Sequence, residues 1–327
     1  MATFWIKKFA ALGLAIGATV APAQALVITP TFNGMTAAEQ AVVNAAISFY
    51  DSAFSDPITV DIEFHRMFSG LGANVSAVYS VDYSAYRSHL IADATTGTDN
   101  AAIAASVTPG ATDPVHGQSR LSIKPALGRA VGFATPGVSL TASGFCNFTG
   151  DGCVGINTDI TTLNCGVYSM LAVVEHEIDE VLGLGSGLLS NGSIFLNQAM
   201  PEDLFRYAGA GVRSFATNSC SGTVPTAYFT LDGGTTNLRG FNNCNNGGDY
   251  GDWAAGTPAL VQDAFATPHA TPSLTTASPE ALALDAIGYD LTTTSASASA
   301  PEPASMALLL SGLAGVALVR RRQRQVG

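Results

Sequence analysis

Charged side chains are scarce in this chain of 327 residues. They make up 12% of the sequence, and 14 Lys and Arg against 25 Asp and Glu give a formal net charge of −11. No basic cluster occurs outside the extreme C-terminus, which argues against nucleic-acid binding. Low charge combined with many Thr, Ser, Asn and Gly residues is instead typical of an exported protein.

Cysteine is also scarce, with five residues, but an exported chain is expected to use them in disulfides. Cys146 and Cys153 bracket a short loop, and Cys220 and Cys244 bracket a segment rich in Gly and Asn. These are the preferred pairs, although sequence alone does not fix connectivity. Cys165 is left over and is expected to be a buried, inert thiol.

The N-terminus has the three parts of a secretory signal peptide. Lys7 and Lys8 precede an apolar run from Phe9 to Val20, and an Ala-Gln-Ala site ends at Ala25. We expect signal peptidase to cut after Ala25, so that residues 1–25 are removed. The alternative is a buried N-terminal helix.

One stretch, from Val173 to Gly183, combines helical periodicity with reactive side chains. His176, Glu177 and Glu180 converge on one face, because residues four apart lie above one another on a helix. The opposite face is an apolar stripe, which indicates that this helix packs against a core. The stripe comprises Val167, Met170, Leu171, Val174, Ile178, Val181 and Leu182.

The charges of this predicted helix are unusual. Four acids occur within six residues, Glu175, Glu177, Asp179 and Glu180, near the end that carries the negative pole of the helix dipole. A bound cation would offset this arrangement, and His176 and Glu180 are suitable zinc ligands. The alternative is a solvated acidic face with one incidental histidine.

The remaining pattern predicts an α+β fold, in one large domain or two small ones. Thr36 is a candidate cap for the first helix. The segment from Pro109 to Pro136 is expected to be rich in loops. Helices are predicted at Met35–Ser55, Tyr83–Asp93, Asn100–Ser106 and Pro279–Tyr289, and strands at Ile58–Met67, Asn74–Val81, Val138–Leu140 and Val154–Ile156.

Calcium is a possible second cofactor. The run from Asn147 to Gly152 loosely resembles a calcium loop but lacks the closing Glu, so a turn pinned by a disulfide is the favoured interpretation. Asp249 and Asp252 lie between glycines and are candidate calcium ligands, with a solvated turn as the favoured alternative.

The C-terminus resembles the PEP-CTERM sorting signal of Gram-negative bacteria. A linker at 292–300 leads into Pro301-Glu302-Pro303, an apolar run at 304–319 and then Arg320-Arg321-Arg322. The resemblance implies recognition by an exosortase and removal of residues 301–327. The apolar run is expected to be a transmembrane helix that holds the chain transiently in the inner membrane, with its arginines cytoplasmic. The processed chain would then lie at the cell surface or outside the cell.

The stretch His176-Glu177-x-x-Glu180-x-x-Gly183 resembles the active-site helix of the metzincin zinc metalloproteases. The set of motifs also resembles a family of exported bacterial putative metalloproteases. That resemblance implies a metalloprotease-like domain over residues 26–291, with a mixed sheet, a central active-site helix and a loop-rich C-terminal part. The motifs that carry it are His176–Gly183, Asp203–Tyr207, Asp232–Gly234, Gly248–Trp253 and Leu284–Tyr289.

The resemblance implies roles residue by residue. His176 matches the first zinc ligand, Glu177 the general base and Gly183 the glycine at the turn. Glu180 replaces the second ligand histidine, and Ser186 stands at the position of the third. The implied activity is hydrolysis of peptide bonds in a protein or peptide substrate, with zinc or another divalent metal activating water.

Two other functions fit the same features. The chain would be a non-enzymatic surface or biofilm-matrix protein if the metalloprotease fold is degenerate. It would be a hydrolase of glycans or esters if the metal helix serves another substrate. Stoichiometric metal that is lost on His176→Ala would separate the enzymes from the matrix protein.

Overall fold

The computed structural model describes residues 25–142, 146–164, 166–189, 191–216 and 226–292. The chain divides into a compact unit that ends at Leu291 and a second unit from Thr292 onward. Within the described residues the architecture is α+β, with one central sheet, smaller sheets and six α-helices. The predicted fold class is therefore confirmed at this level.

The central sheet has four strands in the order β1-β2-β8-β3. The first three are parallel, and β3 lies antiparallel to β8 at the edge of the sheet. The predicted strand at 58–67 is confirmed as β2, whereas β1 was not predicted. The bounds are β1 Val27–Asn33, β2 Thr59–Arg66, β8 Gly152–Ile156 and β3 Gly72–Val75.

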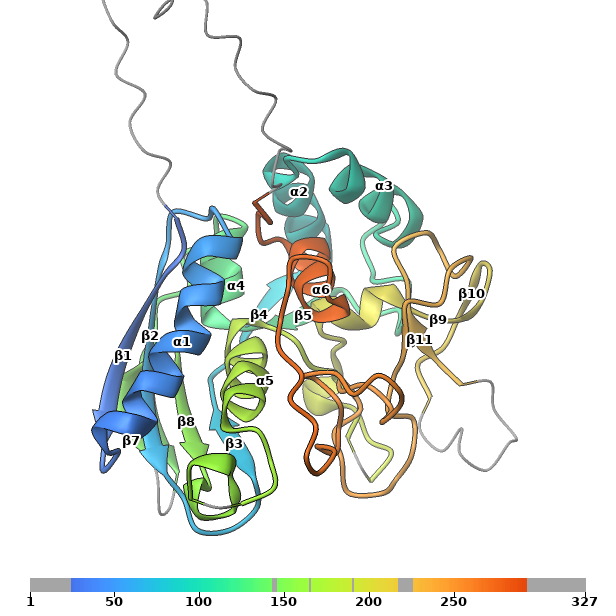
Figure 1. Ribbon diagram of the computed structural model, residues 1–327. Coiled ribbons are helices and arrows are strands. Elements are labelled where there is room, and N and C mark those ends of the chain that lie inside the picture. The colour runs from blue at the N-terminus through green and yellow to red at the C-terminus, as the bar shows by residue number, and fades with distance from the viewer. Residues whose placement is uncertain (1–24, 143–145, 165, 190, 217–225, 293–327) are drawn as a thin grey trace, which may run out of the picture. The chain divides into compact units, whose positions relative to one another are not determined.

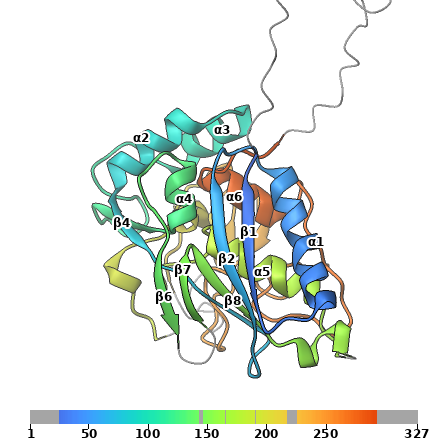
Figure 2. The same ribbon diagram turned by 90° about the vertical axis from the view of Figure 1, so that its left-hand side faces the viewer.

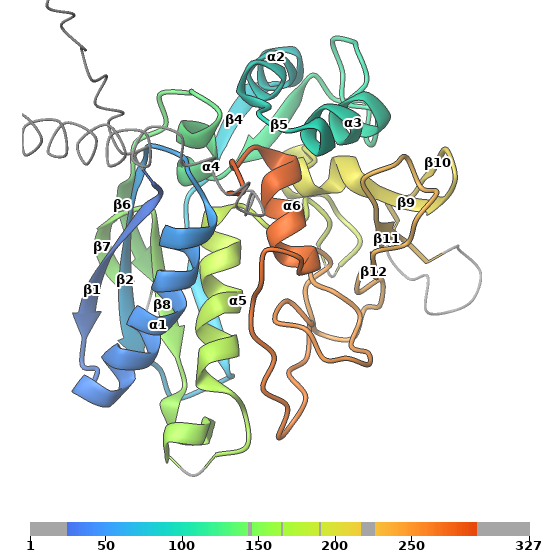
Figure 3. The same cartoon turned by 45° about the horizontal axis from the view of Figure 1, so that its top comes forward.

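Two helices cover one face of this sheet, α1 (Ala37–Ala53) and α5 (Met170–Leu182), and they lie side by side (Figures 1 and 3). Thr36 caps α1 in a capping box with Glu39, as its sequence predicts. The Tyr50 hydroxyl of α1 donates a hydrogen bond of 2.8 Å to Asp179 of α5. A polar contact thus links the two helices inside the core.

A hairpin covers the opposite face of the sheet (Figure 2). It consists of β6 (Val138–Ala142) and β7 (Cys146–Gly150), and the predicted disulfide between Cys146 and Cys153 ties it to β8. Asp151 follows β7 and forms an ion pair of 2.8 Å with Arg129. Its carboxylate is therefore already engaged, which supports the structural interpretation of this segment over a calcium loop.

One strand prediction for the middle of the chain is wrong, and one loop-rich segment contains short elements that were not predicted. The single strand expected at 74–81 is two strands in different sheets, β3 and β4 (Tyr79–Asp82). The segment from Pro109 to Pro136 is mostly irregular, as expected, but it also contains β5 (Arg120–Ile123), which pairs with β4, and α4 (Pro125–Ala130). These short elements depend on partners that are distant in sequence, so local pattern does not define them.

The remaining helices follow the predicted pattern with small shifts at their ends. The last helix ends at Gly288, whose φ of 118° suits a residue without a side chain. The bounds are α2 Tyr83–Asp93, α3 Gly97–Ser106 and α6 Pro279–Ile287. Among the described residues, no helix has the length and apolar character that a membrane crossing needs.

Loops make up most of the chain between α5 and α6, as expected. A small sheet in the order β10-β9-β11-β12 is the main regular element there. Its strands are β9 Arg206–Gly209, β10 Val212–Arg213, β11 Tyr228–Phe229 and β12 Arg239–Gly240. Short 3-10 turns occur at Thr158–Ile160, Thr162–Asn164, Phe195–Asn197 and Pro201–Phe205.

Candidate metal centre

Helix α5 carries some of its polar side chains in a pocket and others buried against the core. Ser169 caps its N-terminus, and Gly183, with a φ of 142°, ends it. His176, Glu177 and Glu180 line a pocket, as the helical spacing predicts. The three residues come from about one turn of one helix, so their relative placement is set by local geometry.

The alternative of a solvated acidic face is wrong. Glu175 is 3% exposed and Asp179 is fully buried, both beneath the helix rather than on its surface. Asp179 accepts a hydrogen bond from Tyr50, and Glu175 accepts one from the backbone N–H of Leu274. Burial raises the pKa of Glu175 to about 7 and that of Asp179 well above its ordinary value.

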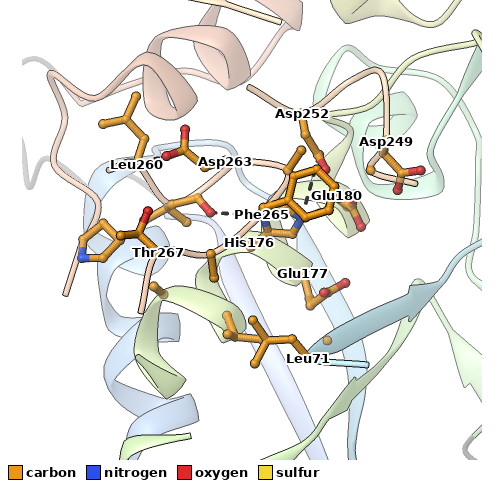
Figure 4. Close-up of a pocket in the computed structure, with 18 of the residues that line it drawn as sticks. Leu71, His176, Glu177, Glu180, Asp249, Asp252, Leu260, Asp263, Phe265 and Thr267 are labelled. Carbon is orange, nitrogen blue, oxygen red and sulfur yellow. Dashed lines mark hydrogen bonds and ion pairs between the residues drawn. The ribbon is translucent and has the colours of Figure 1, made fainter. Parts of the chain in front are cut away.

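Asp252 joins the two helix residues from a distant loop (Figure 4). The His176 Nε2 atom lies 3.7 Å from Glu180 Oε1 and 3.8 Å from Asp252 Oδ1. Sequence reasoning placed Asp252 only in a weak calcium candidate with Asp249. The sequence feature that contains Asp252 is the Gly-Asp-Tyr-Gly-Asp-Trp run, and this run does not indicate which part of the fold it contacts.

Glycines and a tryptophan bring Asp252 to the helix. A Cβ on Gly251 would lie 2.4 Å from the Cα of Gly185, so the two backbones meet at a distance that only glycine permits. Trp253 is buried, and its indole N–H donates to Glu280 at 3.1 Å. The residues on both sides of Asp252 are thus fixed by packing.

The next loop orients the candidate ligands. His176 Nδ1 lies 3.0 Å from the carbonyl oxygen of Val261, so the N–H at Nδ1 donates there and Nε2 faces the carboxylates. Gln262 Nε2 donates to Asp252 Oδ1 at 2.9 Å and lies 3.5 Å from His176 Nε2. Hydrogen bonds of this kind, between a metal-ligating side chain and a neighbouring residue, are typical of metal centres.

Glu177 occupies a different position, toward strand β3 (Figure 4). The side-chain amide of Asn74 donates to Glu177 at 3.4 Å and also contacts Glu180. A Cβ on Gly72 would lie 2.3 Å from Glu177 Oε1, so the strand approaches the carboxylate at a glycine. Glu177 therefore borders the three converging groups without being one of them.

The close approach of these buried groups shifts their pKa values. Burial, with the charge of Glu180 in addition, raises the pKa of Glu177 to about 8. Burial also raises the pKa of Asp252 to about 8, although the charge of His176 acts in the opposite direction. Burial alone would lower the pKa of His176, but the Asp252, Glu180 and Glu177 carboxylates outweigh it and raise that pKa to about 10. Burial also lowers the pKa of the nearby Lys124 ammonium, although the charges of Glu180 and Asp249 act to raise it.

The side chains at this centre fit a divalent metal. Ligand atoms about 2.0–2.2 Å from a tetrahedral zinc lie roughly 3.3–3.6 Å apart. The two separations from His176 Nε2 exceed this by only a few tenths of an ångström, and all three ligand atoms lie within 4.8 Å of one another. One imidazole and two carboxylates would neutralise a dication. Ser186, at the position of the third metzincin ligand, instead donates a hydrogen bond to Asp203 at 2.6 Å.

The pocket at this centre has a volume of about 570 Å³. Edge strand β3 and Leu71, which precedes it, form one wall, and the loop that includes Leu260 and Phe265 forms another (Figure 4). Asp249 lies at its exposed rim. The space beside the candidate ligands is therefore large enough for several residues of an extended chain.

Comparison with known proteins identifies one segment. Residues 299–323 match the PEP-CTERM protein-sorting motif. No curated protein and no solved structure shows significant similarity to the chain. The match implies that the protein is exported, sorted toward the cell surface or exterior, and processed by an exosortase.

Several predicted features lie outside the described residues. They include the signal peptide before Ala25, the apolar run of the sorting signal, Cys165 and Cys220. Cys244 is disulfide-bonded, and its pairing with Cys220 stays a prediction. The transmembrane helix likewise stays a prediction for residues 304–319.

Proposed function

We propose that this protein is an exported, metal-dependent endopeptidase. His176, Glu180 and Asp252 would hold the metal, and Glu177 would act as the general base. The observation that carries the proposal is the convergence of one imidazole and two carboxylates in a pocket, with a third, buried carboxylate beside them.

The edge strand supports a peptide as the substrate. Strand β3 pairs with β8 on one side only, which leaves one row of its backbone N–H and C=O groups unpaired within the sheet. An extended peptide can add to such an edge through main-chain hydrogen bonds. Because Gly72 and Asn74 of this strand lie beside Glu177, a peptide on the edge would pass directly over the candidate base.

The chain's own residues can perform the proton transfers of hydrolysis. When bound, a divalent metal would acidify a water molecule and polarise the substrate carbonyl. Glu177 would accept the proton of that water and deliver it to the leaving amine. The Asn74 amide holds this carboxylate in place, and the contact between His176 and the Val261 carbonyl keeps the Nε2 lone pair directed into the centre.

The donor set bears on the choice of metal. Two carboxylates supply more negative charge than the histidines they replace, so they make a bound cation less Lewis acidic and favour a harder ion than zinc. Zinc, manganese and cobalt should therefore each be added to the metal-free chain, and the hydrolysis that each restores should be compared. The cation that restores the most hydrolysis identifies the working metal.

The decisive variant is Glu177→Gln. It keeps the shape of the side chain but cannot accept a proton, so hydrolysis of an unfolded protein substrate should fall by about 10²–10⁴-fold while metal content is retained. Asp159→Asn is the control and should keep full activity. Asp159 is an exposed acid that pairs with Arg66 and does not line the pocket.

Retained proteolysis in Glu177→Gln, or equal loss in Asp159→Asn, would count against Glu177 as the base. A wild-type chain that holds no stoichiometric metal and cleaves no peptide would favour the non-enzymatic surface protein. Metal without peptide cleavage, but with ester or glycan hydrolysis that depends on Glu177, would support the third function.

A further inference from the structure

A second pocket lies on the opposite side of the central sheet from α5. It has a volume of about 600 Å³ and is bounded by the ends of β1 and β2 and by the start of β7. The lining includes Asn33, Glu63, His65, Phe68, Cys146 and Asn147. Figure 2 shows this side of the sheet, where the β6–β7 hairpin lies against β2 and β8.

Two metal-ligating side chains point to this side from one strand. Glu63 and His65 are two residues apart on β2, and residues at that spacing share a face of a sheet. His65 Nε2 lies 3.2 Å from Glu63 Oε1. Asn33 is the direct cross-strand neighbour of His65, and its amide donates to Glu63 at 3.3 Å.

Glu63 is unusual for a sheet residue, because only 7% of it is exposed. Its Oε2 atom has no hydrogen-bond partner among the described residues. A buried carboxylate oxygen without a partner is unfavourable. The contact with His65 involves the other oxygen, so a simple ion pair of the two residues does not account for Oε2.

The surrounding charges allow a cation here. Arg66, next along the strand, directs its guanidinium to Glu39 and Asp159, at 3.5 Å and 2.8 Å, so its charge is compensated by these acids. The sulfur of Cys153 is within 4.8 Å of the Glu63 and His65 ligand atoms, but it belongs to the disulfide and is not a thiolate. The groups here that are able to coordinate a cation are therefore an imidazole, a carboxylate and nearby amide oxygens.

We propose that this pocket is a second site for a divalent metal, held by the Glu63 carboxylate and His65 Nε2. The Asn33 amide and water would complete the coordination. An imidazole with oxygen donors suits a borderline ion such as zinc better than magnesium or calcium. The site is structural: it ties β1 to β2 beneath the hairpin. It shares no residue with the centre on α5, so it does not depend on the proposed function.

The test is a zinc titration of the purified full chain by calorimetry, with metal content measured in parallel. The starting variant is His176→Ala, which disables the centre on α5. This variant should still bind about one zinc ion per chain. Adding Glu63→Gln, which keeps the side-chain shape, or His65→Ala should weaken that binding by at least about 10-fold. Adding His116→Ala, a histidine elsewhere in the fold, should not.

Thermal unfolding guards against a folding artefact. Zinc should raise the Tm of His176→Ala but leave the Tm of His176→Ala/Glu63→Gln unchanged, while both chains unfold cooperatively without metal. The proposal is overturned if His176→Ala binds no stoichiometric zinc. It is equally overturned if binding and the Tm shift survive both Glu63→Gln and His65→Ala, since the zinc would then lie elsewhere.

Discussion

The two sides of the α5 pocket are built in different ways. On one side, a single regular helix supplies His176, Glu177 and Glu180. On the other, a loop-rich region supplies Asp252, and a neighbouring segment supplies Gln262. The helix side is set by a repeat of 3.6 residues, whereas the loop side is set by individual packing contacts.

This difference has an energetic consequence. A helix residue keeps its direction as long as the helix exists, and α5 is held by the core on the sheet. The direction of Asp252 depends on Gly251 against Gly185 and on the burial of Trp253. We therefore expect substitutions outside the candidate ligands to change the position of Asp252 on the loop side. The same kind of substitution should leave His176 and Glu180 on the helix side in place.

The strongest test of the comparison is Asp252→Ala. If the loop supplies a ligand, this change should reduce metal affinity by more than about 100-fold. Loss of a residue that only hydrogen-bonds to a ligand usually has a smaller effect. Metal affinity is measured by competition with a chelator. Asp249→Ala, an acid at the pocket rim, is the control and should bind nearly as wild type does. Equal losses in both variants would indicate a general charge effect rather than ligation.

A smaller effect is expected from Gln262→Ala. The Gln262 amide donates to Asp252 and contacts His176, so its loss should weaken metal binding by about 10–100-fold without removing any ligand. Gln198→Ala is the matched control, since that glutamine accepts hydrogen bonds from Ser80 and Ser122 away from the pocket. Unchanged affinity in Gln262→Ala would show that Asp252 is oriented by other contacts.

Gly251→Ala tests the packing of the loop itself. The added Cβ would lie 2.4 Å from the Cα of Gly185, so the backbones must separate, at a cost of about 2 kcal/mol in the free energy of unfolding. Denaturant unfolding measures this. Gly240→Ala is the control, because the nearest atom to its Cβ is 4.0 Å away. Equal stability of the two variants would remove the argument for close approach.

The smallest expected effect concerns pH and a carboxyl remote from the pocket. Burial, then the charge of Asp99, raises the pKa of Asp285 in α6 to about 8, against roughly 3.9 in the unfolded chain. The folded state binds more protons between these values, so this group's stabilising contribution is full below about pH 4 and falls as pH rises toward 8. Asp285→Asn should therefore gain about 1 kcal/mol over wild type for each pH unit between about pH 5 and pH 7.

Thermal unfolding across that pH range checks the sign. Asp159→Asn, at an exposed acid, provides the reference curve. A variant whose advantage over wild type shrinks as pH rises would contradict the inferred direction for Asp285.

Regular elements were the most predictable part of the fold. The cap at Thr36, the β2 strand and the faces of α5 follow from local periodicity and from hydrogen bonds within a few residues. The Cys146–Cys153 disulfide was predictable for the same reason, because its cysteines are seven residues apart. Short strands such as β4 and β5 were not, since their pairing partners lie far along the chain.

The sequence by itself determined the residues of one helical turn, His176, Glu177 and Glu180, because helical geometry relates them whatever the rest of the chain does. It also carried the C-terminal sorting motif, which is a linear signal. Only the tertiary structure decided that Asp252 completes the group and that Gln262, 86 residues beyond His176, contacts it. Such contacts arise from packing between distant segments, and neither spacing nor composition encodes which loop meets which helix.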